Sequence, residues 1–122
     1  MSRTVLQPGP QHPITVEPAA ARITVTAGGT PVADTTAALA LQEAKYPTVY
    51  YIPLADVRSD VLKPSDHTTY CPYKGDASYY SLATPNGEVA DAAWYYAEPY
   101  PAVADIAGHV AFYADKVDIT AT

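Results

Sequence analysis

Residues 67–96 read HTTYCPYKGDASYYSLATPNGEVADAAWYY and contain three segments of strand composition separated by two turns. The segments cover residues 67–70, 77–82 and 89–96, and they are rich in the β-branched and aromatic residues that favour strands. Between them, residues 74–76 and 85–87 supply the Gly, Asp, Pro and Asn that tight turns use. This stretch therefore predicts successive strands joined by short turns, as in an antiparallel sheet.

The same pattern extends in both directions along the chain. Residues 110–113 and 117–120 have strand composition, with a turn at residues 115–116. Residues 22–34 alternate apolar and polar side chains on either side of a Gly-Gly pair, which predicts a hairpin. Residues 48–52 are β-branched or aromatic on both faces, which is typical of a strand covered on two sides.

Two segments are less regular. Residues 35–44 have helix-favouring composition, yet Leu39 and Leu41 are two positions apart, so the segment is either a short helix or a strand. Residues 56–62 have room for one or two helical turns, which would stop before Pro64.

These elements predict an all-β fold with one or two short helices, arranged as a bent antiparallel sheet or an open barrel. The β-α-β alternation of a nucleotide-binding parallel sheet is not visible in the sequence. Residues 1–13 contain three closely spaced prolines and are predicted to form an extended leader, followed by a single domain over residues 14–122.

Composition narrows the function classes. The chain has 122 residues and a formal net charge of −6, which opposes binding to nucleic acid or an anionic membrane. It contains no apolar run long enough for a signal peptide or a membrane span, so we expect a cytoplasmic protein. Its one cysteine, Cys71, excludes an internal disulfide and an ordinary structural zinc site. No metal or cofactor is predicted.

Several short sequence motifs together resemble those of one bacterial family, domain of unknown function 427. One motif is Thr-Thr-Tyr-Cys-Pro-Tyr-Lys-Gly at residues 68–75, whose most specific part is Cys-Pro-Tyr-Lys-Gly at residues 71–75, and the resemblance spans residues 12–118. The other motifs are HPI at residues 12–14, VAD at 32–34, VYYIP at 49–53 followed by DV at 56–57, AAWYY at 92–96 and IAGHVAFY at 106–113.

The resemblance implies an all-β fold similar to the β-tent group, which includes methionine-R-sulfoxide reductases and the drug-binding domain of cereblon. Those relatives commonly hold zinc on two cysteine pairs, and this sequence lacks the pairs. The family is sometimes labelled nucleotidyltransferase-like, but the sequence has no Gly-Ser signature followed by two aspartates that could hold magnesium and a triphosphate.

The motif at residues 71–75 contains a candidate catalytic group. Cys71 is a potential nucleophile, and Lys74 could lower its pKa if the turn folds back. His67 or Asp56 could handle protons, although His67 would lie about 13 Å from Cys71 along a straight strand. The structural alternatives are that Cys71 is a small buried residue and that Asp56 caps a turn.

The aromatic residues offer a second kind of site. The chain has eleven Tyr beside one Trp and one Phe. Trp94 and Tyr96 alternate on one strand face, and with Tyr51 and Tyr113 they could form an aromatic cage, joined by Tyr73 from the turn at residues 71–75. Packing in the core explains these rings equally well.

Three functions remain open at this stage. The first is a module that binds a small molecule in the aromatic and polar pocket. The second is an enzyme with Cys71 as nucleophile, tuned by Lys74. The third is a structural or interaction protein, which the acidic composition and the leader favour; the oligomeric state leaves no signal in the sequence.

Overall fold

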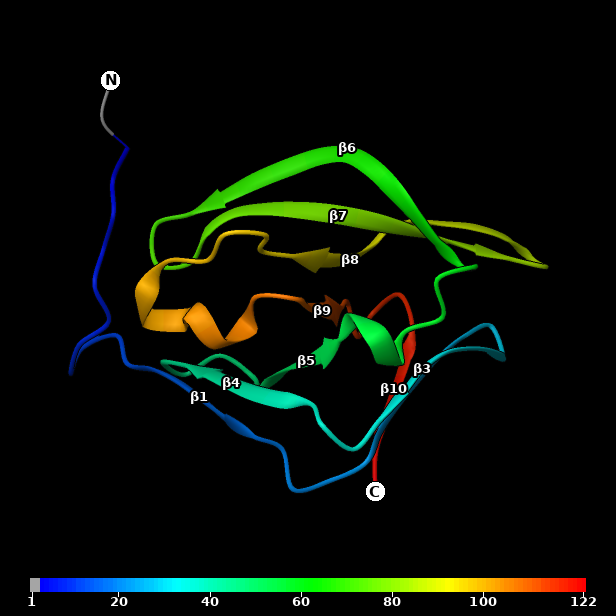
Figure 1. Cartoon of the computed structure of the whole chain (residues 1–122), viewed down its shortest axis with the longest axis horizontal. Coiled ribbons are helices and arrows are strands. Elements are labelled where there is room, and N and C mark those ends of the chain that lie inside the picture. Colours follow the sequence, from blue (N-terminus) through cyan, green and yellow to red (C-terminus); the bar gives the residue numbers. More distant parts are fainter. Residues whose placement is uncertain (1–2) are drawn as a thin grey trace.

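The computed structural model describes residues 3–122, and its regular elements are mostly antiparallel strands (Figure 1). The prediction of an all-β fold is confirmed. The strands are β1 (Ile14–Pro18), β2 (Ile23–Ala27), β3 (Thr30–Thr35), β4 (Leu39–Glu43), β5 (Val49–Pro53), β6 (Leu62–Cys71), β7 (Gly75–Thr84), β8 (Gly87–Tyr95), β9 (His109–Phe112) and β10 (Asp118–Ala121); two 3-10 helices, η1 (Leu54–Asp56) and η2 (Pro101–Ile106), complete the fold.

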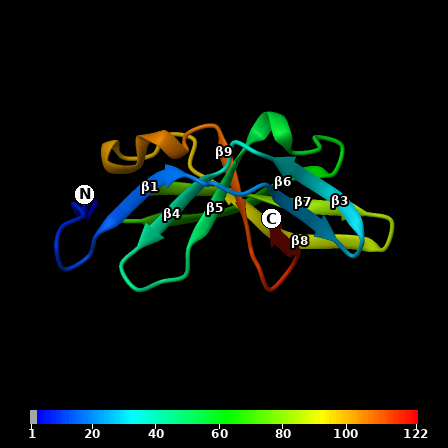
Figure 2. The same ribbon diagram turned by 90° about the horizontal axis from the view of Figure 1, so that it is seen from below.

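The strands form a large sheet and a small one. Seven strands pair in the order β1-β4-β5-β9-β8-β7-β6, and three pair in the order β10-β2-β3. In Figure 1, β6, β7 and β8 form an upper wall, β1, β4 and β5 form a lower wall, and β9 lies between them. The view from below shows β1, β4 and β5 side by side (Figure 2). The large sheet is therefore bent and does not close into a barrel, since β1 and β6 are its two edges.

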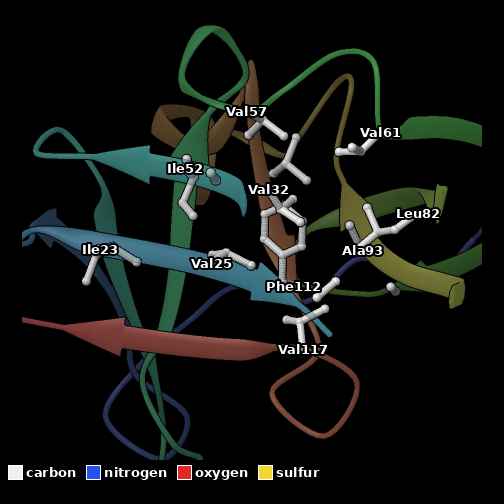
Figure 3. Close-up of a cluster of buried hydrophobic side chains, with 14 of the residues drawn as sticks. Ile23, Val25, Val32, Ile52, Val57, Val61, Leu82, Ala93, Phe112 and Val117 are labelled. Atoms are coloured by element: carbon white, nitrogen blue, oxygen red, sulfur yellow. The ribbon is translucent and has the colours of Figure 1, made fainter. Parts of the chain in front are cut away.

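The bent sheet has a core on each of its faces. One core is mainly aliphatic and includes side chains from β2 and β3 of the small sheet packed against Ile52, Leu82 and Phe112 of the large one (Figure 3). The other core is rich in tyrosine and includes Val103 and Ile106 of η2. Because successive strand residues point to opposite faces, β5, β7, β8 and β9 each supply both cores.

The hairpin predicted over residues 22–34 is confirmed as β2 and β3. Gly28 and Gly29 form its turn with φ values of 56° and 85°. Both values lie in the left-handed region that glycine adopts without a steric penalty, as a two-residue hairpin turn of this hand requires.

The structure resolves the two irregular segments. Residues 39–43 form β4, so the helical alternative for residues 35–44 is wrong; pairing with β1 and β5 outweighs the local helix preference. The helix predicted over residues 56–62 is also wrong, because the helical turn precedes it at η1 and β6 begins at Leu62. β6 continues through Pro64, which is tolerated because β6 is an edge strand with a register shift between Pro64 and Thr68.

The described part of the leader, residues 3–13, lies against the turn between β6 and β7. The Leu6 amide donates to the Pro72 carbonyl over 3.0 Å, and the Tyr70 hydroxyl donates to the Thr4 carbonyl over 2.6 Å. Arg3 pairs with Asp76. Residues 1–2 of the predicted leader lie outside the described residues. Across residues 3–122, no helix has the length and apolar character needed to cross a membrane.

Candidate functional site

A cavity of about 180 Å³ opens on the tyrosine-rich face of the large sheet. It lies where the two walls of the bent sheet approach each other, so strands far apart in sequence contribute to it. Its lining consists of Leu41 and Glu43 from β4, Tyr46 and Pro47 from the β4–β5 loop, Val49 and Tyr51 from β5, Lys74 from the β6–β7 turn, Tyr79 from β7, Trp94 from β8, Tyr96 just after β8, and Tyr113 just after β9.

Most of the ring residues singled out from the sequence line this cavity. Tyr51, Trp94, Tyr96 and Tyr113 are all among its walls, and so is Lys74. Trp94 and Tyr113 approach with ring centroids 4.5 Å apart at an interplanar angle of 45°. Tyr51 meets Trp94 edge to face at 6.4 Å. These are the tilted and edge-on arrangements that aromatic pairs favour.

The polar atoms of these rings form short hydrogen-bonded chains. The Trp94 indole nitrogen donates to the Tyr51 hydroxyl over 3.2 Å. The Tyr113 hydroxyl donates to that of Tyr79 over 3.5 Å, and Tyr79 is also hydrogen-bonded to the Thr69 hydroxyl at 2.9 Å. Among the described residues, the Tyr96 hydroxyl has no hydrogen-bond partner. Every fully buried side-chain nitrogen or oxygen atom of these residues does have one. The Tyr96 hydroxyl is therefore not fully enclosed, and its side chain lines the cavity.

Burial raises the pKa values of three tyrosines of this cavity, Tyr51, Tyr96 and Tyr113. It raises the pKa values of the Tyr51 and Tyr96 phenols well above the ordinary value. Burial, together with the hydrogen bond to Tyr79, raises the pKa of Tyr113 to about 12. All these hydroxyls can therefore donate hydrogen bonds at neutral pH.

One end of the cavity is charged. The Lys74 ammonium pairs with one carboxylate oxygen of Glu43, and the His12 ring nitrogen Nε2 lies 2.8 Å from the other. The Lys74 side chain is 12% exposed and that of Glu43 is 15% exposed. Burial raises the pKa of the Glu43 carboxyl, but the hydrogen bonds from Lys74 and His12 outweigh it and hold the pKa below its ordinary value. A half-buried ion pair thus terminates an otherwise aromatic cavity.

Tyr73 lies outside the cavity but next to its charged end. Its ring stacks on that of His12, with centroids 4.2 Å apart and planes 8° from parallel. Both residues line a neighbouring depression formed with the leader. Tyr73 therefore positions His12, which contacts Glu43, and does not itself face the aromatic walls.

Among the residues proposed for catalysis, Cys71 and Lys74 lie in one turn, where the Lys74 amide donates to the Cys71 carbonyl over 3.2 Å, whereas Asp56 and His67 lie elsewhere. Cys71 is half-buried and packs against the tyrosine-rich core, while the Lys74 ammonium is paired with Glu43. Asp56 is exposed at the end of η1, where it accepts a hydrogen bond of 2.7 Å from Thr35. His67 is exposed, and its ring packs at 4.5 Å against the ring of Tyr79. Among the described residues, no hydrogen bond or ion pair links Asp56 or His67 to Cys71.

Sequence reasoning missed six of the lining residues, and Glu43 and Tyr79 are the two of them whose side chains hydrogen-bond to other residues of the site. A strand signal was available for Tyr79, since it is two positions after Ala77 and both point into the tyrosine-rich core. Glu43 had no comparable signal, because the segment that contains it was compatible with helix or strand. Its role depends on Lys74 and His12, which are 31 residues away from it in either direction.

The zinc site expected from the resemblance to β-tent proteins does not fit this chain. A site of four cysteines needs three more than the sequence contains, and Cys71 packs beside apolar and aromatic side chains. Within residues 3–122, no group of three or more His, Cys, Asp and Glu side chains is arranged to hold a metal ion.

The family assignment rests on a comparison with family models. A model described as a domain of unknown function, DUF427, matches residues 15–122, which is nearly the whole chain. A search of curated proteins found no match. The matched region includes every cavity-lining residue, whereas His12 precedes it. The chain therefore belongs to the family known as domain of unknown function 427.

Proposed function

We propose that this protein binds a small molecule in the aromatic cavity. The observation that supports this proposal is the convergence of five aromatic side chains, from four strands of a bent sheet, on one open space with a charged end: Tyr51, Tyr79, Trp94, Tyr96 and Tyr113. Ligand sites in proteins commonly combine apolar and aromatic walls with a few placed polar groups.

The size of the cavity limits the ligand. An engineered cavity of about 150 Å³ holds benzene, whereas sites for drug-sized molecules begin at about 300 Å³. A cavity of about 180 Å³ is therefore matched to a molecule with a single ring. Larger ligands would need to extend past Tyr46, which is 63% exposed at the rim.

Trp94 provides a direct assay, because it is the one tryptophan of the chain and it lines the cavity. We expect single-ring aromatic compounds to change its fluorescence in a saturable way. Val49→Phe, which adds a ring to the cavity wall, should abolish the response while the protein stays folded. Tyr80→Phe is the matched control, since Tyr80 packs against the aliphatic core on the opposite face. A panel of single-ring compounds with no saturable effect on Trp94 would overturn the proposal.

Catalysis by Cys71 stays a prediction of the sequence, as does a structural or interaction role. The half-buried position of Cys71 leaves the first open, and the pairing of Lys74 with Glu43 weakens the case that Lys74 activates the thiol. Alkylation of the native protein against pH, read by intact mass, tests reactivity. A reaction midpoint well below the ordinary thiol pKa of about 8.5 would favour catalysis.

A further inference from the structure

We propose that the cavity selects a neutral, planar ring that carries a carbonyl oxygen. This inference rests on the proposed binding function and adds the chemical class of the ligand. The ligand class depends on which hydrogen-bond donors and acceptors of the cavity already have partners within the protein.

The free groups are donors. The Tyr96 side chain lines the cavity, and its hydroxyl is not fully enclosed and has no hydrogen-bond partner among the described residues. The Tyr51 hydroxyl accepts a hydrogen bond from Trp94, and its own proton has no acceptor among the described residues. The Lys74 ammonium has three N–H donors, and one of them donates a hydrogen bond to Glu43.

The strongest acceptor is occupied. One carboxylate oxygen of Glu43 is hydrogen-bonded to the Lys74 ammonium, and the other is hydrogen-bonded to the His12 ring. The Tyr79 hydroxyl is engaged by Thr69 and Tyr113. The Lys74 ammonium can only donate, and both oxygens of the one carboxylate already take part in hydrogen bonds with charged or ring nitrogens. The ligand group that best complements the remaining donors is therefore an acceptor.

Charge disfavours an ionic ligand of either sign. A carboxylate on the ligand would be attracted to the Lys74 ammonium. It would also be repelled by the Glu43 carboxylate, which is already paired with that ammonium. A cation would be attracted by the aromatic faces, yet Lys74 lies in the same lining with its positive charge. A neutral carbonyl accepts from the hydroxyls and the ammonium without breaking the ion pair. The flat aromatic walls favour a planar ring to carry it.

The indole N–H of Trp94 gives one resonance in a heteronuclear NMR spectrum, because the chain has one tryptophan. We would titrate the protein with acetophenone, benzoate, benzylamine and toluene, which share one ring and differ in the attached group. Acetophenone is expected to shift this resonance and to bind at least about tenfold more tightly than each of the others, the ratio that one hydrogen bond can supply.

Two outcomes separate this inference from the binding function itself. Tightest binding by benzylamine, benzoate or toluene would overturn the carbonyl assignment and leave the cavity as a binding site. No shift with any of the four probes would overturn both.

Variants locate the donors. Tyr96→Phe removes the free hydroxyl and should weaken acetophenone binding about fivefold, while leaving toluene binding unchanged. Tyr95→Phe is the matched control, because the neighbouring ring packs against the aliphatic core. Equal affinity of the Tyr96→Phe protein and the unaltered protein for acetophenone would contradict the assignment of Tyr96 as a donor to the ligand.

Discussion

The two faces of the large sheet are built from neighbouring residues of the same strands and differ in chemistry. On β5, Tyr51 faces the tyrosine-rich core and Ile52 faces the aliphatic one. On β8, Ala93 packs in the aliphatic core and Trp94 packs against the tyrosine-rich core. The same backbone therefore supports two interiors, and the cavity with the aromatic lining opens on the tyrosine-rich face.

Side-chain shape explains the difference. Branched aliphatic residues interdigitate to crystal-like density when the small sheet covers them. Tyrosine rings are rigid and flat, and each hydroxyl needs a partner or water when it is buried. On the tyrosine-rich face, Tyr79 meets this requirement with Thr69 and Tyr113, whereas the Tyr96 hydroxyl has no partner among the described residues and is not fully enclosed. The aliphatic face is therefore expected to dominate stability and the aromatic face to dominate recognition.

The largest expected effect is on the aliphatic face. Ile52 is 1% exposed, and Ile52→Ala should lower the free energy of unfolding by about 3 kcal/mol, through lost burial and the cavity left behind. Urea denaturation measures this loss. Ile52→Val, which removes one methylene, should cost about 1 kcal/mol. A loss below about 1 kcal/mol for the alanine variant would show that this face is not the stabilising one.

The ion pair at the end of the cavity gives the next effect. Glu43→Gln should lower the free energy of unfolding at neutral pH by about 1.5 kcal/mol, because it replaces charge-assisted hydrogen bonds on a partly exposed group. The folded-state pKa of Glu43 is depressed, so the unfolded chain binds the proton more readily. Its contribution is therefore present at neutral pH and lost as the pH falls through the folded-state pKa.

The measurement for this pair is urea denaturation of both proteins across acidic and neutral pH. The difference between the unaltered protein and Glu43→Gln should shrink as the pH is lowered below about 4. A difference that stays constant with pH would mean that the charge of Glu43 does not contribute.

A smaller effect is expected inside the aromatic face. Tyr79→Phe removes the hydroxyl shared with Thr69 and Tyr113 and should cost about 1 kcal/mol. Thermal unfolding of this variant and of Thr69→Val compares the two sides of the hydrogen bond. Unchanged stability of Tyr79→Phe would indicate that water replaces the lost contacts.

The smallest expected change in the free energy of unfolding is at Tyr96, on the tyrosine-rich face. Tyr96→Phe should change the free energy of unfolding by less than about 0.5 kcal/mol, because its hydroxyl has no protein partner to lose among the described residues. The ring itself, which is 6% exposed, still packs in the same core. A loss as large as that of Tyr79→Phe would place the Tyr96 hydroxyl in a structural hydrogen bond instead of at the cavity.

Local patterns in the sequence predicted most of the strands. Period-two alternation and turn residues depend on neighbours a few positions away, so the hairpin of β2 and β3 and the strands β7 and β8 followed from them. The errors came where distant pairing decides. Residues 39–43 become a strand because β1 and β5 flank them, and Pro64 stays in a strand because β6 is at an edge.

The sequence by itself determined the all-β class and the family, since strand alternation and the motif at residues 68–75 are local properties of the chain. It also supplied Tyr51, Trp94, Tyr96 and Tyr113 as candidate ring residues. Tertiary structure alone decided that they share one cavity with Tyr79, and that Glu43 joins Lys74 to His12 at its end. The physical reason is that the bend of the sheet brings β4 and β5 opposite β7 and β8, and no local spacing in the chain encodes that approach.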